Sequence, residues 1–465
     1  MGLPNGQPHS EKEKIVMKKI SMMLAMVFVL SCIFSVQVFA LTDGDWEFKL
    51  LDNEVTVTGY LGESKDVVIP KEIYGTSVTK VLMDNGKNFK AATSITFPET
   101  VTEVKNLSSY SETLEKVTFN EGLKIIHDRA LQENKKLKYV NIPSTIEEIG
   151  DYAFYACKAL ESVTFPASLK KLGQGAYEHS GVKSVDFTSA NPTIGEFSFL
   201  CCESLESVNL GTALTNVGSS MFSGAKSLKE VIIPNTVTMI KSGGFRECES
   251  LESIILPTSL KHIGIGAFTG CKSLVEVVIP YGVTAIENAF GDCTNLKSLY
   301  VPDTVSDRYP VFVSGTDNCI VYCTADSPTA AECKDRGISY LTDNSVNSGI
   351  TVLYNGTRIS FHAHGQNPEL INNRTLVPLR SIFEAMNAKV EWDGATNTAI
   401  ATRGAITVKV PIGESAIYKN GSAIPTDVPA QLINDRTMVP ARVIAESFGA
   451  DVQWNGYGNV VMINE

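Results

Sequence analysis

Residues 153–166 read Ala-Phe-Tyr-Ala-Cys-Lys-Ala-Leu-Glu-Ser-Val-Thr-Phe-Pro, and this pattern recurs from about Leu114 to Pro302. Its aromatic position, Phe154, returns at intervals of 22 or 23 residues, at Tyr177, Phe199, Phe222, Phe245, Phe268 and Phe290. A fixed period of this length is typical of a solenoid, because one short unit cannot bury its own apolar face and must share a core with its neighbours.

Each unit has a readable internal pattern. Val163 and Phe165 are expected to point inward and Thr164 outward, by the two-residue period of a strand. Leu169 and Leu172 add a second inward pair, and the Ala-Phe-x-x-Cys segment is expected to form a short helical turn whose aromatic ring fills the coil. Roughly ten coils stacked about 4.8 Å apart would make a rod about 45–50 Å long.

The cysteines follow the repeat. At the position of Cys157, other units carry Ser180 or Ala225, so the position accepts a small buried side chain. Free cysteine behaves as a small hydrophobic residue. We therefore predict buried thiols rather than disulfides at Cys157, Cys202, Cys248, Cys271 and Cys293. Three further residues lie beyond the repeat: Cys319, Cys323 and Cys333. Two of them could form one disulfide bridge, and their spacing fits no zinc motif.

The chain has 465 residues, 43% of them hydrophobic, and a formal net charge of -11. It has no basic patch of the kind that binds nucleic acid. Lys18 and Lys19 precede an apolar run from Ile20 to Phe34, and a small-residue cleavage pattern ends at Ala40. This pattern predicts a signal peptide over residues 1–40, with translation starting at Met17, and a secreted or surface-associated protein without a transmembrane segment after cleavage.

The segments on either side of the repeat are predicted to close it. Residues 41–90 alternate like short strands and are expected to cap the first coil. The solenoid then spans residues 91–310, a C-terminal cap residues 311–342 and a polar linker residues 343–349. Within the second cap, Ser327 and Pro328 are expected to begin a helix that Gly337 ends.

The phrase Ala-Phe-x-x-Cys-x-x-Leu-x-x-Val-x-Phe/Ile-Pro resembles the BspA-type leucine-rich repeat of bacterial surface proteins, over residues 41–341. The expected fold class is therefore α+β: a leucine-rich repeat solenoid of short parallel strands and helical turns, followed by a small duplicated α+β domain. The resemblance implies an exported protein that acts by adhesion and binds host or matrix proteins.

The last segment repeats itself. Residues 371–380 return as residues 433–442, and the offset of 62 continues to Trp392 and Trp454. Each half is expected to contain a helix that begins at a proline and ends at Asn387 or Gly449, residues that tolerate a left-handed conformation. The duplicated Asn-x-Arg-Thr-x-Val-Pro-x-Arg motif makes residues 350–465 similar to the copper amine oxidase N-terminal domain, or stalk domain.

This second resemblance does not imply catalysis. In the oxidases, copper and the tyrosine-derived quinone lie in a separate catalytic domain, which nothing in this chain resembles. His362 and His364 are weak metal candidates, because two ligands without a third do not define a site. We expect no enzymatic activity, no catalytic residues and no cofactor.

The outward face of the strands changes character along the repeat. The position of Thr164 is polar in six units and then apolar in four, at Ile232, Ile255, Val278 and Tyr300. Glu230 and Glu276 stand two residues before Ile232 and Val278 and would form a polar rim. An exposed apolar ridge of this kind marks a contact surface. Either it receives a partner, or the C-terminal cap or the stalk domain covers it.

From these features we predict a non-enzymatic cell-surface protein that binds protein or glycan partners through the solenoid, with the six ridge and rim residues as the partner-binding site. The alternative is a structural spacer or cell-envelope scaffold without a specific ligand.

Overall fold

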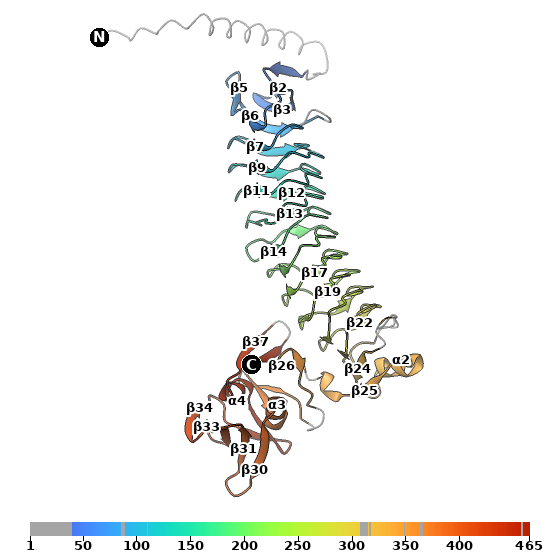
Figure 1. Ribbon diagram of the computed structural model, residues 1–465, viewed down its shortest axis with the longest axis vertical. Coiled ribbons are helices and arrows are strands. Elements are labelled where there is room, and N and C mark those ends of the chain that lie inside the picture. Colours follow the sequence, from blue (N-terminus) through green and yellow to red (C-terminus); the bar gives the residue numbers. More distant parts are fainter. Residues whose placement is uncertain are drawn as a thin grey trace, which may run out of the picture.

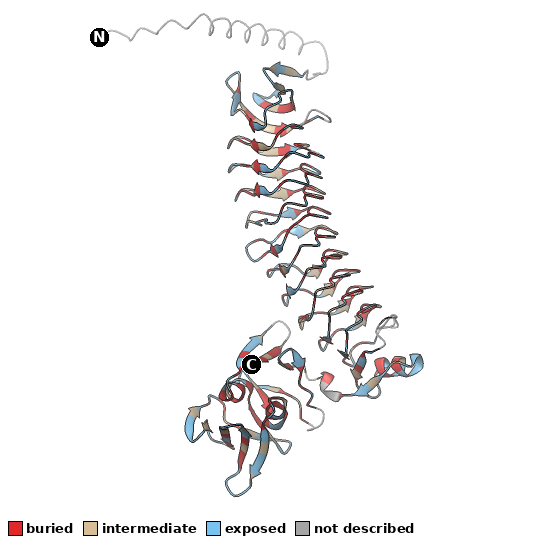
Figure 2. Ribbon diagram, in the orientation of Figure 1, coloured by how far each residue is buried: buried red, intermediate tan, exposed pale blue. Residues whose placement is uncertain are grey.

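The computed structural model describes residues 40–84, 89–108, 110–306, 315, 318–347, 349–361, 366–456 and 459–465. The predicted signal peptide, except Ala40, lies outside these residues. A curved solenoid forms most of the molecule, and the C-terminal domain lies beside its last coils (Figure 1). Buried residues run as a continuous column through the solenoid (Figure 2).

The solenoid begins with a small sheet. Strands β1 (Leu41–Asp43), β2 (Trp46–Leu51) and β3 (Glu54–Tyr60) are antiparallel. Strand β6 (Thr76–Leu82) pairs in parallel with β3 and continues into the coils, while β5 (Glu72–Ile73) pairs with β6. Of the alternating apolar residues seen in the sequence, Phe48, Val55 and Val57 are buried in this sheet, whereas Leu50 is 38% exposed. The first coil is thus covered by polypeptide rather than open to water.

Two parallel ladders run along the solenoid. The ladder predicted from the Val-x-Phe position is formed in three stretches: β4 (Asp66–Val68), β7 (Ser94–Thr96), β9 (Lys116–Thr118) and β11 (Tyr139–Asn141); β14 (Ser184–Asp186), β16 (Ser207–Asn209) and β18 (Glu230–Ile232); and β21 (Glu276–Val278), β23 (Ser298–Tyr300), β24 (Ile320–Cys323) and β25 (Tyr340–Thr342). Regular pairing lapses around residues 162–165 and 253–256. There the inward and outward alternation persists, since Phe165 is buried and Thr164 exposed.

The Leu-x-x-Leu position forms the second ladder, which the sequence suggested only as an inward pair. Its short strands are β8 (Glu103–Lys105), β10 (Ile125–Ile126), β12 (Glu148–Ile149), β13 (Lys171–Leu172), β15 (Thr193–Ile194), β17 (Asn216–Val217), β19 (Met239–Ile240), β20 (His262–Ile263) and β22 (Ala285–Ile286). Each turns one apolar side chain toward the core and its neighbouring side chains outward, with Ile194 of β15 only partly buried. The solenoid core is therefore held between two sheets.

The aromatic residues of the repeat form one column. From Phe154 to Phe290, successive rings lie 5.0–5.7 Å apart and within 12° of parallel. The segment around them is a tight turn rather than a helix. The residue before the cysteine position has a positive φ in every coil, at Ala156, His179, Cys201, Gly224, Glu247, Gly270 and Asp292. A left-handed residue there stops helix propagation and turns the chain toward the next strand.

The predicted thiols are confirmed. Cys157, Cys202, Cys248, Cys271 and Cys293 are free and buried, as are the three cysteines beyond the repeat. Each of these five Sγ atoms donates to a backbone carbonyl of the preceding coil at 3.1–3.4 Å. In an earlier coil, Asn134 fills the same position, and its Nδ2 donates to the carbonyls of Ser108 and Leu131. The position therefore holds a small buried side chain that in most coils also donates a hydrogen bond to the preceding coil, although Ala225 shows that the donor is not obligatory.

The chain leaves the solenoid through helix α2 (Pro328–Arg336) and the 3-10 helix η1 (Asn344–Asn347). The Ser327 hydroxyl accepts the backbone N–H of Ala330, and Gly337 has a φ of 68°, so both predicted ends of this helix are confirmed. The segment predicted as a polar linker is not an open tether, because Asp343 is buried.

The C-terminal domain is built around a pseudo-two-fold axis. Strands β28 (Glu369–Ile371), β29 (Arg374–Pro378), β36 (Arg436–Pro440) and β35 (Gln431–Ile433) form one sheet, in which Val377 pairs with Val439. These two valines are 62 residues apart, so they occupy equivalent positions in the two halves of the duplication, and the halves pair with each other here. Helices α3 (Leu379–Ala385) and α4 (Ala441–Ser447) follow the prolines, and Asn387 and Gly449 have positive φ, as predicted.

Two further sheets complete the domain. One contains β30 (Lys389–Asp393), β31 (Thr398–Arg403), β32 (Ile406–Pro411), β33 (Ala416–Lys419) and β34 (Ser422–Pro425) in that order. The other has the order β27 (Thr357–Arg358), β26 (Thr351–Tyr354), β38 (Val460–Asn464) and β37 (Asp451–Asn455). Phe383 of α3 and Phe448, after α4, meet in the shared core at 5.1 Å between ring centroids. The β26–β38 sheet is the part of the domain that faces the solenoid.

Candidate functional site

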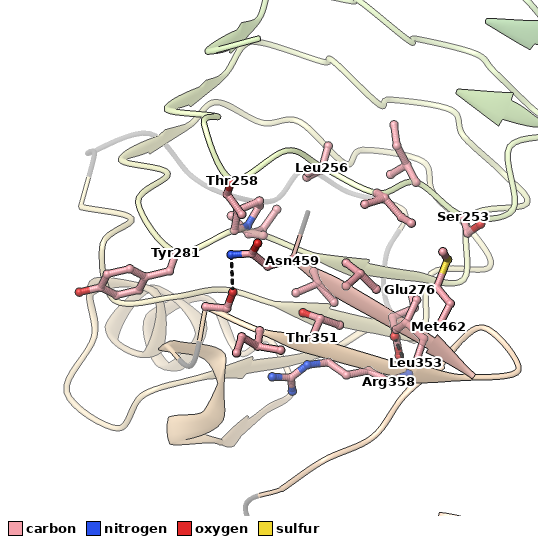
Figure 3. A pocket seen from close by; sticks show the side chains of 18 of the residues that line it. Ser253, Leu256, Thr258, Glu276, Tyr281, Thr351, Leu353, Arg358, Asn459 and Met462 are labelled. Carbon is pink, nitrogen blue, oxygen red and sulfur yellow. Dashed lines mark hydrogen bonds between the residues drawn. The ribbon is translucent and has the colours of Figure 1, made fainter. Parts of the chain in front are cut away.

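A cleft of about 360 Å³ lies between the last coils of the solenoid and the C-terminal domain. Ile255 and Val278 line it from the solenoid, and Leu353 and Met462 line it from strands β26 and β38. Tyr281 lies at one end of the cleft, and Glu276 lies with Met462 at the other (Figure 3). The cleft thus joins apolar side chains from two parts of the chain that are far apart in the sequence.

Arg358 fastens the C-terminal domain to the solenoid at this cleft. Its backbone N–H donates to Oε1 of Glu276 at 2.8 Å. Its guanidinium lies 4.3 Å from the ring centroid of Tyr300 and pairs with Asp343, at 3.4 Å from Nη1 to Oδ2. The side chains of this ion pair are both 3% exposed. Such a pair is expensive to break, because removing one partner leaves the other charge buried.

Further hydrogen bonds extend the junction. Nδ2 of Asn235, in the turn after β18, donates to the carbonyl of Gly456 at 3.0 Å. The backbone N–H of Asp303 donates to Oδ1 of Asn347 at 3.1 Å. The C-terminal domain is therefore attached to several coils, and not through the linker alone.

The electrostatics of the cleft centre on Glu276. Partial burial raises the pKa of this carboxyl to about 7, although the backbone hydrogen bond from Arg358 and the charge of Arg358 oppose the rise. Burial also raises the pKa of the neighbouring Tyr300 hydroxyl. Glu276 is therefore a titratable group at an interface between two structural units.

The predicted ridge is not a continuous exposed surface. Ile232 is 37% exposed and Ile255 and Val278 are partly buried, whereas Tyr300 is only 5% exposed. Arg358 covers the Tyr300 ring on one side, and Tyr322 stacks on it with centroids 4.5 Å apart. The expectation of an open ridge is therefore wrong at Tyr300, because the C-terminal domain covers this end of the ladder.

The two residues of the predicted acidic rim also differ in their exposure to solvent. Glu230 is exposed, but Glu276 accepts the hydrogen bond from Arg358 and belongs to the junction. Sequence reasoning identified Ile255, Val278 and Glu276 but missed Arg358 and Asp343. The periodicity of the repeat cannot indicate which residue outside the repeat meets its outward face.

The metal candidates His362 and His364 lie outside the described residues. Within the described part of the chain, no group of three or more His, Cys, Asp or Glu side chains could hold a metal ion. No helix among the same residues is long and apolar enough to cross a membrane.

Comparison with known families assigns both units. Six copies of the BspA type leucine rich repeat region match residues 87–206 and 192–309, which are the coils described above. Residues 87–309 are a BspA-type leucine-rich repeat region. The copper amine oxidase N-terminal domain family matches residues 353–463, so the C-terminal unit is a domain of that family. Leucine-rich repeat solenoids of the BspA type are typically non-enzymatic.

Several solved structures are similar to the chain. A leucine-rich cell surface protein from Faecalibacterium prausnitzii shares 22% identity with it, over 58% of this chain and 91% of that one, with a TM-score of 0.37. For a leucine-rich repeat protein from Bacteroides ovatus, the identity is 23%, over 63% and 99%, and the TM-score is 0.34. The pneumococcal vaccine antigen PcpA gives 17%, over 66% and 100%, with a TM-score of 0.38. No curated protein matches the chain.

Proposed function

We propose that the protein is an exported, non-enzymatic cell-surface protein that binds a protein or glycan partner through its repeat solenoid. The contact surface is the cleft beside Ile255 and Val278, with Ile232 as its continuation along the ladder. The observation that carries the proposal is the open cleft itself, in which apolar side chains of the BspA-type region stay within reach of a ligand. Exposed apolar surface in an otherwise polar face is characteristic of contact sites.

The composition of the cleft fits recognition. Its volume is at the lower end of ligand sites, which are commonly about 300–1,000 Å³. Tyr281 stands at the mouth and is 50% exposed, so it can provide the aromatic contact that dominates many binding surfaces. A partner is therefore expected to insert one apolar group into the cleft and to contact Tyr281 outside it.

Binding of the full chain to a panel of extracellular matrix proteins and to a glycan array tests the proposal. For any ligand found, Tyr281→Ala should weaken affinity about tenfold, which corresponds to about 1.4 kcal/mol. The matched control is Tyr139→Ala, because Tyr139 has the same exposed fraction as Tyr281 but lies in a distant coil. Equal effects of the two substitutions would show that the cleft is not the contact surface.

A structural spacer remains the second candidate, and the junction favours it. The buried Arg358–Asp343 pair and the contact from Asn235 fix the C-terminal domain against the solenoid, as a rigid spacer requires. The spacer reading expects no ligand from the panel and no difference between the Tyr281 and Tyr139 variants.

A further inference from the structure

The C-terminal domain has a second groove, which shares no lining residue with the interdomain cleft. It measures about 520 Å³ and is lined by Trp392 of β30 and Leu432 of β35. These side chains are 47% and 54% exposed and line the same groove, so they present a joint apolar surface to solvent. They come from opposite halves of the duplication, so the groove exists only because the two halves fold against each other.

Both strands that carry these residues are sheet edges. Strand β30 pairs only with β31 among the described residues, and β35 pairs only with β36. An edge strand presents unpaired backbone N–H and C=O groups, which another extended chain can satisfy. The groove therefore offers backbone hydrogen bonding beside two large apolar side chains.

The charged side chains around the groove balance. Arg380 and Arg436 contribute two positive charges, and Glu391 and Asp435 contribute two negative charges. A strongly charged ligand would therefore find no net electrostatic attraction here. A peptide with an apolar side chain between polar residues could place the apolar group in the groove and its polar groups against these charges. Addition of a strand to a sheet edge, with side-chain pockets for specificity, is an established mode of peptide recognition.

The second half of the duplication carries a tryptophan in the equivalent place. Trp454 also lies on an edge strand, β37, and is exposed. The carbonyl of Gly456, two residues further on, accepts the hydrogen bond from Asn235 of the solenoid. The acceptor of this bond lies just beyond β37, so the bond attaches the domain to the solenoid without occupying the β37 edge.

We propose that the groove between β30 and β35 binds an extended peptide segment of another protein, which pairs with the β30 edge and places a large apolar side chain against Trp392 and Leu432. This site is independent of the cleft beside Ile255. It gives the C-terminal domain a binding role of its own, in addition to its attachment to the solenoid.

A phage-displayed library of random decapeptides, selected on the full chain, provides the probe. Enriched peptides should lose about tenfold in affinity on Leu432→Ser and on Trp392→Ala. The matched control is Leu341→Ser, because Leu341 is 52% exposed and lies in β25 of the solenoid. Circular dichroism of each variant verifies folding, and Tyr281→Ala separates this site from the cleft, since it should leave peptide affinity unchanged.

Strand pairing has its own test. N-methylation of alternate peptide amides should abolish binding in one register and preserve it in the other, because only one set of amides faces β30. The chain has three tryptophans, so the indole NMR signal of Trp392 can be assigned by substitution and should shift on peptide addition. The proposal is overturned if no peptide is enriched, if enriched peptides are insensitive to both groove variants, or if oligosaccharides rather than peptides shift the Trp392 signal.

Discussion

Replacing Glu276 by glutamine tests the electrostatics of the interdomain junction. Glutamine keeps an oxygen that can accept the backbone N–H of Arg358 but removes the titration of the carboxyl. The folded-state pKa of Glu276 is raised to about 7 from an ordinary value of 4.5, mainly by burial beside Tyr300 and Arg358. A raised carboxyl pKa means that the folded protein holds a proton that the unfolded chain has lost. The free energy of unfolding therefore falls as the pH rises from 4.5 through 7.

The size of the effect follows from the pKa change. A pKa raised from 4.5 to about 7 corresponds to about 3 kcal/mol of differential stability. Because Glu276 is only partly buried, solvent screening reduces this figure. We expect the wild-type protein and Glu276→Gln to have similar stability at pH 4.5, and the variant to be more stable by about 1–2 kcal/mol at pH 8.

Denaturant unfolding of both proteins between pH 4.5 and pH 8 measures this difference. Unfolding should be followed both by the fluorescence of Trp454, which lies beside the junction, and by far-UV circular dichroism. Two probes are needed because a chain of two units need not unfold in one step. Glu230→Gln is the control, since Glu230 occupies the equivalent position in an earlier coil and is exposed. A stability difference between wild type and Glu276→Gln that stays constant across this pH range would refute the reasoning.

Three further predictions concern the core and the junction. Tyr177→Phe should raise stability by about 1 kcal/mol, measured by thermal unfolding, because among the described residues its buried hydroxyl has no hydrogen-bond partner and the adjacent coils carry Phe154 and Phe199 there. Arg358→Ala should cost about 3–5 kcal/mol by removing the cation that faces the buried carboxylate of Asp343, and Arg358→Met with Asp343→Leu should recover most of that loss in denaturant unfolding. At pH 8, iodoacetamide should label the partly exposed Cys201 before Cys157, since burial raises the pKa of the Cys157 thiol to about 12; equal rates by mass spectrometry would contradict this.

The sequence was sufficient to predict the solenoid because its information is local and repeated. Each coil places the same apolar residue at the same position, so the inward residues and the thiols follow from one unit. The second ladder was harder to predict, since its two-residue strands at positions such as Lys171–Leu172 carry no alternation of their own. The duplicated motif likewise predicted both C-terminal helices and the left-handed residues that end them.

The candidate site was predicted only in part. Periodicity identified the apolar outward positions at Ile255 and Val278 but not what lies on them. Tyr300 is covered by Arg358, which lies 58 residues later and outside the repeat. Asp343 was assigned to a linker because its neighbours are polar, yet the ion pair with Arg358 buries it. Contacts between units depend on long-range docking, which no local pattern encodes.

Hydroxyl-radical footprinting of the full chain measures whether the C-terminal domain covers the apolar end of the ladder. Tyr139 and Tyr300 lie on the same ladder, but Tyr139 is 50% exposed and Tyr300 only 5%. With the domain docked through Arg358, Tyr139 and Tyr281 should be oxidised readily and Tyr300 should be protected. Oxidation of Tyr300 as fast as Tyr139 would contradict this docking, and with it the cleft on which the proposed function rests.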